Sequence, residues 1–204
     1  MEDNKKTLVA YMIVLLIIIV MGGIAPASRI VWILQSTGIL IVGILIIIYN
    51  EKLNLSRISL MLIFIYLMLG AIGSHYSYEK VPIENLKDIL GTQKDPHDRI
   101  VHFSFGLLLF YPILDFYKKQ TKLKNNFWLY FVPLIIITGI GACYEIVEWS
   151  IGMIIDPENT YAFLGMMGDQ WDAQKDMALN TMGAAFAMLM TMVSRAYKTG
   201  KIDL

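Results

Sequence analysis

The chain has 204 residues, of which 56% are hydrophobic and 17% are charged, and its formal net charge is zero at neutral pH. A soluble domain of this length would carry about a quarter charged residues, so the composition indicates a polytopic membrane protein whose surroundings are the lipid bilayer. The zero net charge and the lack of a basic patch or nucleic-acid motif exclude nucleic acid as an expected partner. The single cysteine, Cys143, rules out an intramolecular disulfide, and we expect a small buried side chain there.

Six apolar stretches are long enough, or nearly so, to cross a bilayer, which takes about 20 helical residues. They lie at Leu8–Ile24, Ile30–Tyr49, Ile58–Tyr76, Ile100–Phe116, Phe127–Trp149 and Asp176–Tyr197. The pattern predicts an all-α bundle of about six transmembrane helices, which forms one integral membrane domain over residues 1–204. The first stretch also carries features of a signal peptide, and whether it is cleaved stays open.

The lysines and arginines of the loops favour one orientation of this bundle. Eleven of them fall on the side that holds both termini, and six fall on the other side. By the positive-inside rule, both termini are predicted to be cytoplasmic in a multi-pass protein of the bacterial cytoplasmic membrane. An amphipathic stretch between the third and fourth spans, Val81–Gly91, is expected to lie as a short helix on the outer membrane surface.

A polar stripe marks the start of the sixth span. Its members are spaced 3, 4, 4 and 3 residues apart and are Asp169, Asp172, Asp176, Asn180 and Gly183. At about 100° per residue, this spacing puts all five on one face of a helix. Asp169 is explained as a helix cap, whereas Asp176 and Asn180 lie too deep to cap and must face something other than lipid. Gly183-x-x-x-Ala187 continues the face and is typical of close helix packing.

Two further polar groups should reach the same membrane face, because alternating topology brings the starts of spans four and six and the end of span five together. The fourth span opens with Asp98, Arg99 and His102, and the fifth ends with Glu145 and Glu148. Asp98 is favourable in a first turn, and Arg99 is expected to extend outward to the interface or to a lipid phosphate. The two glutamates are less easily explained, because the helix macrodipole disfavours an anion at a C-terminus by about 0.3–1 kcal/mol.

These converging side chains predict a metal site facing the outside. We assign His102, Glu145 and Asp172 as ligands and Glu148 or Asp176 as the general base. Carboxylates with an imidazole suit Zn²⁺ or Mn²⁺, and carboxylates with water suit Mg²⁺. A hydrogen-bonded carboxylate and histidine network without metal, and purely structural pairing, stay open as alternatives.

Three runs of sequence resemble the YjdF-like family of bacterial inner-membrane proteins. They are His97–Phe103 with Phe105-Gly106, then Tyr144–Trp149, then Leu164–Met177. Most of the chain shares this likeness, and residues 95–190 hold the motifs, with Asp98-Arg99 where such families usually have Asp-Lys. A looser likeness over the second half, through Asp176-x-x-x-Asn180-x-x-Gly183, links the chain to VanZ-like membrane proteins, which are associated with glycopeptide-antibiotic resistance. The resemblance implies a multi-pass membrane protein and supplies neither a substrate nor catalytic residues.

The leading hypothesis is an enzyme at the outer leaflet that acts on a lipid-linked or envelope substrate by metal-assisted hydrolysis or group transfer. Clustered polar groups at a membrane edge, which are costly to keep there, motivate this hypothesis. The first alternative is a protein that binds or transports a small molecule coupled to a cation or proton, and the second is a non-catalytic scaffold for envelope proteins. The substrate, the metal and the oligomeric state stay open.

Overall fold

The protein is an all-α bundle, described by a computed structural model over residues 2–78, 81–83, 96–121, 126–155, 160, 163–164 and 169–199. The described residues form six long helices and no strand. The helices are α1 (Glu2–Gly22), α2 (Arg29–Leu53), α3 (Arg57–Tyr76), α5 (His97–Thr121), α6 (Phe127–Gly152) and α8 (Asp172–Thr199). All six are long and apolar enough to cross a membrane, so the prediction of six transmembrane helices is confirmed.

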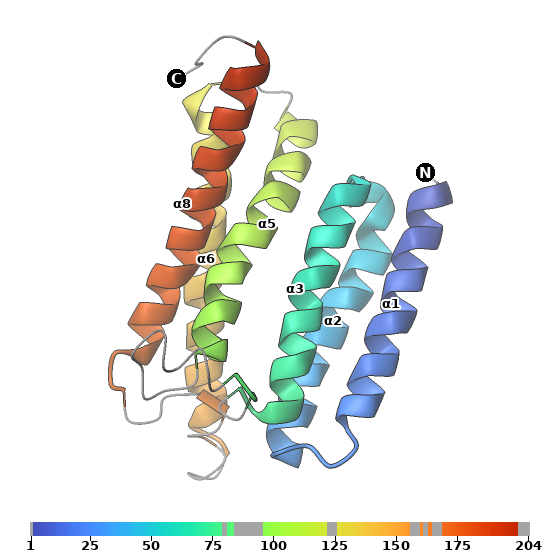
Figure 1. The fold of residues 1–204 in the computed structure, drawn as a ribbon, viewed down its shortest axis with the longest axis vertical. Helices are drawn as coiled ribbons and strands as arrows, with labels where there is room; N and C mark the ends of the chain where they lie inside the picture. Colours follow the sequence, from blue (N-terminus) through green and yellow to red (C-terminus); the bar gives the residue numbers. More distant parts are fainter. Residues whose placement is uncertain are drawn as a thin grey trace.

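The helices form two groups that stand side by side (Figure 1). One group comprises α1, α2 and α3, and the other comprises α5, α6 and α8, within which α5 and α8 pack most extensively. Helix α3 packs along α5 and joins the two groups. Both chain termini lie at the same end of the bundle, drawn at the top, so the starts of α5 and α8 and the end of α6 lie at the opposite end.

Several helices extend beyond the apolar stretches from which they were predicted. Helix α5 begins at His97 rather than Ile100, and α8 begins at Asp172 rather than Asp176. A helix can continue through polar residues at a membrane boundary, because the hydrogen bonds between its backbone groups do not depend on the polarity of the side chains. The extra turn makes Asp98 part of α5 and Asp172 part of α8, and both carboxylates thereby take fixed positions on helices.

Helices α5 and α8 approach each other at two glycines. A Cβ atom on Gly106 would overlap the backbone oxygen of Asn180, and a Cβ atom on Gly183 would overlap the backbone oxygen of Phe103. Only glycine allows the two backbones to lie this close. The close packing predicted from Gly183-x-x-x-Ala187 is therefore confirmed, and Ala187 is also buried.

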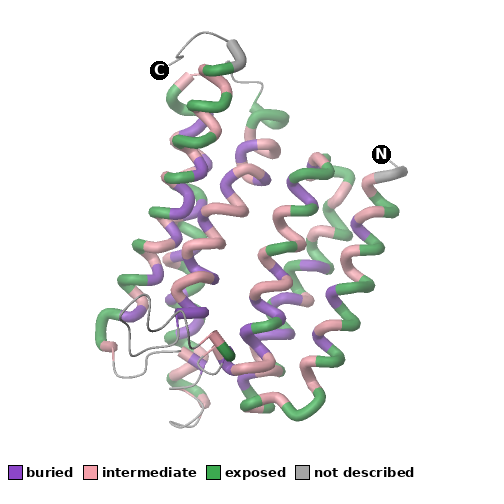
Figure 2. The backbone as a smooth tube through the Cα atoms, viewed as in Figure 1, coloured by how far each residue is buried: buried purple, intermediate pink, exposed green. Residues whose placement is uncertain are grey.

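The polar stripe of α8 faces inward, as its spacing predicted. Asp172, Asp176, Asn180 and Gly183 are all buried, and burial recurs along α8 at this spacing (Figure 2). Deeper in the same three-helix group, the stripe gives way to an apolar cluster that includes Phe110, Leu129, Ile137 and Ala184. The polar end and the apolar core of the group are thus continuous along one helix face.

Two local predictions have different outcomes. Cys143 was expected to be buried, and that expectation is wrong, because its side chain is exposed on α6 beside the exposed Ile140 and Val147. Among the described residues this face of α6 is exposed, as expected for the lipid-facing side of a spanning helix. The predicted surface helix at Val81–Gly91 lies outside the described residues from position 84 onward.

At the end of the bundle that holds the termini, α3 is fastened to α5 by one carboxylate. Asp115 Oδ2 accepts hydrogen bonds from the backbone nitrogen of Ser56 at 2.8 Å and from the hydroxyl of Ser59 at 2.9 Å. Lys119 Nζ lies 3.0 Å from Asp115 Oδ1. The contact with Ser56 gives a hydrogen-bond acceptor to a backbone N–H group at the start of α3, and Lys119 neutralises the charge of Asp115.

Candidate functional site

Polar side chains converge at the end of the bundle opposite the chain termini, as the alternating topology predicted. The buried members come from four helices and are Gln35 of α2, His97, Asp98 and His102 of α5, Glu145 and Glu148 of α6, and Asp172, Asp176 and Asn180 of α8. Each is at most 8% exposed. Burying so many polar and ionisable groups between apolar helices is costly unless they satisfy one another or hold an ion or water.

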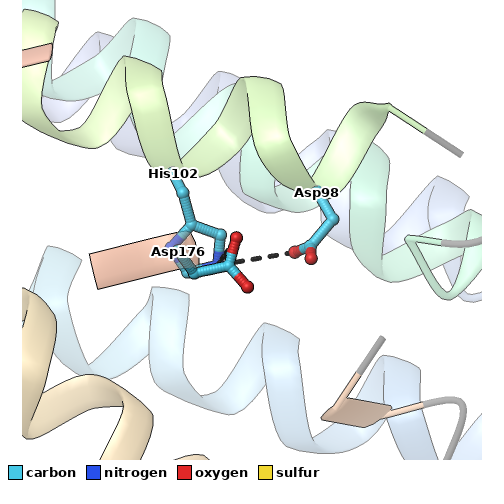
Figure 3. A group of neighbouring side chains, drawn as sticks. All are labelled: Asp98, His102 and Asp176. Atoms are coloured by element: carbon cyan, nitrogen blue, oxygen red, sulfur yellow. Dashed lines mark ion pairs between the residues drawn. The ribbon is translucent and has the colours of Figure 1, made fainter. Parts of the chain in front are cut away.

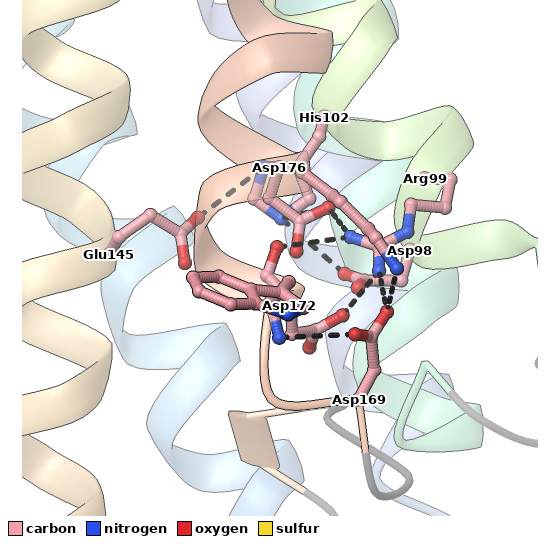
Figure 4. A network of polar contacts seen from close by, with 9 residues as sticks. Asp98, Arg99, His102, Glu145, Asp169, Asp172 and Asp176 are labelled. Carbon is pink, nitrogen blue, oxygen red and sulfur yellow. Dashed lines mark hydrogen bonds and ion pairs between the residues drawn. The ribbon is translucent and has the colours of Figure 1, made fainter.

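Arg99 lies at the outer edge of this cluster and binds the first turn of α8 (Figure 4). Its guanidinium nitrogens pair with Asp172 Oδ1 at 2.5 Å, with Asp169 Oδ2 at 3.3 Å, and with Asp176 Oδ1. The arginine also donates to the backbone oxygen of Asp172 at 3.3 Å. Arg99 therefore points into the acidic cluster and locks α5 to α8, where the sequence led us to expect an outward-extended side chain.

His102 lies at the centre of the cluster, with a carboxylate on each side of its ring (Figures 3 and 4). Its Nε2 atom is 3.4 Å from Asp98 Oδ1 and 4.0 Å from Asp176 Oδ1. Its Nδ1 atom is 3.6 Å from Glu145 Oε1. A neutral imidazole has one donor and one acceptor nitrogen, so acidic groups at both nitrogens call for a protonated ring, a protonated carboxyl group or a cation at one of the nitrogens.

Asp98, His102 and Asp176 lie close enough together that they could hold a metal ion. One ligand atom from each lies within 4.8 Å of the others, and all three residues are buried. Two ligands about 2.1 Å from a tetrahedral ion are separated by about 3.4 Å, which is close to the spacing around His102 Nε2. The predicted set was His102, Glu145 and Asp172. In the structure Glu145 faces the other ring nitrogen, and Arg99 pairs with Asp172 and also with Asp176 Oδ1, so Asp176 differs from Asp172 in its approach to His102 Nε2 at 4.0 Å.

Within the described part of the chain, the buried oxygens Glu145 Oε1 and Asn180 Oδ1 have no hydrogen-bond partner. Gly141 of α6 lies directly against the Asn180 amide, since a Cβ atom at Gly141 would come within 2.5 Å of Asn180 Nδ2. The glycine thus admits the asparagine between α6 and α8, and the unsatisfied oxygens mark places for a proton, a water molecule or an ion.

A second polar group, which the sequence analysis missed, joins the site to α2. Gln35 Nε2 donates to Glu148 Oε1 at 3.4 Å, and Tyr144 donates its hydroxyl to Gln35 Oε1 at 3.2 Å. The signal was present in the sequence, because Gln35 is an amide within an otherwise apolar span. Helix α2 therefore helps to position Glu148. The sequence had led us to expect a site formed by the last three spans alone.

A small polar cavity separates Glu148 from His102. Its volume is about 20 Å³, and its lining also includes Asp98, Tyr66 and Tyr78. A cavity of this size holds about one water molecule when it has polar walls. Burial raises the pKa of the Tyr78 hydroxyl well above its usual value, with further contributions from Tyr66, Glu148 and Asp98, so this tyrosine stays protonated as a hydrogen-bond donor.

Asp169 lies at the entrance to the cluster, just ahead of α8. Its Oδ1 atom accepts a hydrogen bond from the backbone nitrogen of Trp171 at 3.1 Å, a contact within the turn that precedes α8. Lys175 Nζ lies 2.6 Å from its Oδ2 atom. These two contacts, the lysine first, lower the pKa of the Asp169 carboxyl, with a smaller contribution from Arg99. The contacts therefore stabilise the protein above the ordinary carboxyl pKa and are lost as the pH falls through the lowered value.

Comparison with known proteins agrees with this architecture. Residues 7–197 match the family described as "Predicted membrane protein (DUF2238)". The chain is 28% identical over 171 residues to the "Inner membrane protein YjdF" of Escherichia coli (strain K12), and the match covers 83% of this chain and 81% of that relative. No solved structure matches. The likeness and the six apolar helices together identify a multi-pass membrane protein that contacts the lipid bilayer.

Proposed function

This chain belongs to the DUF2238 family of predicted membrane proteins, and we propose that it is a divalent-cation-dependent enzyme whose site lies at a membrane surface. The cation is held by Asp98, His102 Nε2 and Asp176. One observation carries the proposal, namely that His102 has carboxylates within 4.0 Å of both ring nitrogens. A cation at Nε2 satisfies that nitrogen and two carboxylates, and leaves Nδ1–H to donate to Glu145, which then orients the ring.

The charge balance of the cluster supports a cation. Six carboxylates gather there, and they are Asp98, Glu145, Glu148, Asp169, Asp172 and Asp176. The permanently positive side chains described there are Arg99, which pairs with Asp169, Asp172 and Asp176, and Lys175, which pairs with Asp169. Among the described residues, six carboxylates thus share two permanent positive charges, and protons or a cation would supply the rest.

A cation held by Asp98, His102 and Asp176 would supply Lewis-acid activation of a water molecule, and Glu148 would be the general base that accepts the proton of that water. The cavity between His102 and Glu148 has room for about one water molecule. Gln35 donates to the carboxylate of Glu148 and is itself held by the hydroxyl of Tyr144. The water oxygen attacks an ester or phosphoester carried by a lipid-linked or envelope substrate, and the leaving oxygen takes the proton back from Glu148.

The orientation of the site belongs to the same proposal. Loop lysines and arginines number eleven on the side of the termini and six on the side of the cluster. The positive-inside rule then makes the termini cytoplasmic and the cluster external. An external site has direct access to envelope substrates and to the divalent cations outside the cell.

Metal analysis of the purified protein tests the proposal. We expect about one equivalent of Zn²⁺, Mn²⁺ or Mg²⁺ per chain after chelator-free purification, and loss of the metal in His102→Ala and Asp98→Asn. Glu145→Gln should weaken metal affinity by about 10–100-fold, because the glutamate orients a ligand. Glu148→Gln should keep the metal, since the base is not a ligand.

Asp115→Asn is the matched control for the metal analysis, because it makes the same chemical change in a carboxylate at the other end of α5. It should retain the metal of the wild type. A wild-type protein that carries no divalent metal, and takes none up when dialysed against each of the three ions, would refute the proposal. Equal metal content in Asp98→Asn and the wild type would refute the ligand assignment.

A proton-coupled transporter is a second candidate, and the cavity between His102 and Glu148 favours it. A water molecule there would connect titratable groups of α5 and α6 in the interior of the bundle. In proteoliposomes this function predicts a proton flux that is lost in Asp176→Asn and in Glu148→Gln. The Asp115→Asn protein should conduct like the wild type. Absence of flux from wild-type proteoliposomes would exclude this candidate.

A further inference from the structure

A second cavity lies between α5, α6 and α8 at the end of the bundle that holds the chain termini. Its volume is about 620 Å³, which is within the range of about 300–1,000 Å³ that small-molecule sites occupy. Leu114, Leu129 and Met190 form apolar parts of its wall, while Lys118 and Arg195 supply positive charge. The cavity is therefore large enough for a ligand and combines apolar and cationic surfaces.

The acidic residue in the wall does not cancel this positive charge. Asp115 already accepts hydrogen bonds from Ser56 and Ser59, and its carboxylate pairs with Lys119 at 3.0 Å. Arg195 donates to the hydroxyl of Tyr130 at 3.1 Å, which holds the guanidinium in place. The described wall of the cavity therefore carries two basic side chains, Lys118 and Arg195, and one carboxylate that already pairs with a lysine.

The position of the cavity along the helices indicates the kind of ligand. Lys118 lies in the last turn of α5, and Arg195 lies near the end of the apolar span of α8. Residues at the ends of spanning helices lie at the level of the lipid headgroups, whereas Leu114 and Met190 lie one turn deeper, at the level of the acyl chains. The basic side chains therefore lie where a phospholipid has its headgroup, and the apolar wall lies where it has its acyl chains.

We propose that this cavity binds an anionic phospholipid. Lys118 and Arg195 contact the phosphate headgroup, the hydroxyl of Tyr130 keeps Arg195 in place, and the upper acyl chain lies against Leu114, Leu129 and Met190. The apolar wall selects a lipid over free phosphate. This site is at the opposite end of the helices from the acidic cluster, so it is independent of the proposed enzyme activity.

Lipid retention in bilayer nanodiscs tests the proposal on the full chain. The protein is placed in nanodiscs that contain both phosphatidylcholine and phosphatidylglycerol. Native mass spectrometry then counts how many molecules of each lipid remain bound. The wild type should retain phosphatidylglycerol in preference to phosphatidylcholine. Each of Lys118→Gln and Arg195→Gln should reduce that retention about fivefold, and Arg195→Lys should largely preserve it, because one basic residue near the surface contributes about 1 kcal/mol.

Lys52→Gln is the matched control, since Lys52 is an exposed lysine at the same end of the bundle but outside the cavity. Its retention of phosphatidylglycerol should equal that of the wild type. Thermal unfolding shows which variants are folded. If Arg195→Gln does not fold, the test rests on Lys118→Gln, because Lys118 is exposed. Equal retention of both lipids by the wild type, or unchanged retention in Lys118→Gln, would overturn the proposal. Inorganic phosphate that displaces phosphatidylglycerol in detergent would overturn the assignment of a lipid.

Discussion

Replacing Arg99 by glutamine should lower the free energy of unfolding by about 3–5 kcal/mol, because it leaves buried carboxylates without their cation. The side chains of Asp172 and Asp176 are only 4% and 3% exposed, so water cannot replace the lost partner. Arg99 itself is 21% exposed, which favours the lower end of this range. Equilibrium unfolding in mixed micelles, followed by tryptophan fluorescence, measures the change.

Two variants separate the charge effect from a general loss of packing. Lys175→Gln removes an exposed partner of Asp169 and should leave the stability close to that of the wild type, because solvent screens this pair. Arg99→Gln combined with Asp172→Asn and Asp176→Asn should recover at least half of the stability lost in Arg99→Gln alone, because no unpaired carboxylate then remains beside the glutamine. A triple variant less stable than Arg99→Gln would contradict this account.

Introducing a methyl group at Gly106 or Gly183 should separate α5 from α8 and destabilise the protein by about 3 kcal/mol or more. At each position the new Cβ atom would overlap a backbone oxygen of the facing helix, and a backbone cannot move aside as a flexible side chain can. Gly106→Ala should also weaken metal binding, since it displaces His102 of α5 from Asp176 of α8. Unfolding and metal analysis of the same preparation measure both effects.

Gly139→Ala is the matched control for these glycine variants. Gly139 lies in α6, and a Cβ atom there would meet nothing within 4 Å. Alanine is favoured over glycine inside a helix by about 1 kcal/mol, so this variant should be as stable as the wild type or more stable. If Gly106→Ala behaves like Gly139→Ala, then α5 and α8 do not depend on this close approach.

The two effects have a common structural origin in the pairing of α5 with α8. The glycines set how close the two helices lie, and Arg99 fixes their outer ends through the first turn of α8. In this arrangement His102 Nε2 lies 4.0 Å from Asp176 Oδ1. Helix α6 then adds Glu145 to one side of His102, and α2 contributes through Gln35. The candidate site is therefore built on contacts between helices from both groups.

Much of the architecture could be predicted from the sequence, because it depends on properties of single segments. Hydropathy over about 20 residues identifies a spanning helix whatever its neighbours are. The spacing of Asp172, Asp176, Asn180 and Gly183 likewise determines one helix face, and that face is buried in the structure. Alternating topology then brings the starts of α5 and α8 and the end of α6 to one side, which explains why the candidate residues converge.

Which of these residues touch was decided only by the tertiary structure. Asp172 was expected beside His102, but it pairs with Arg99, and Asp98 and Asp176 face the histidine Nε2 atom instead. A turn of an α-helix advances about 5.4 Å, so a small rotation or shift of one helix exchanges one carboxylate for the next. Spacing along one chain segment holds no information about that rotation. It is set by the glycine contacts between α5 and α8 and by the charges at their ends, and these arise only when the helices pack.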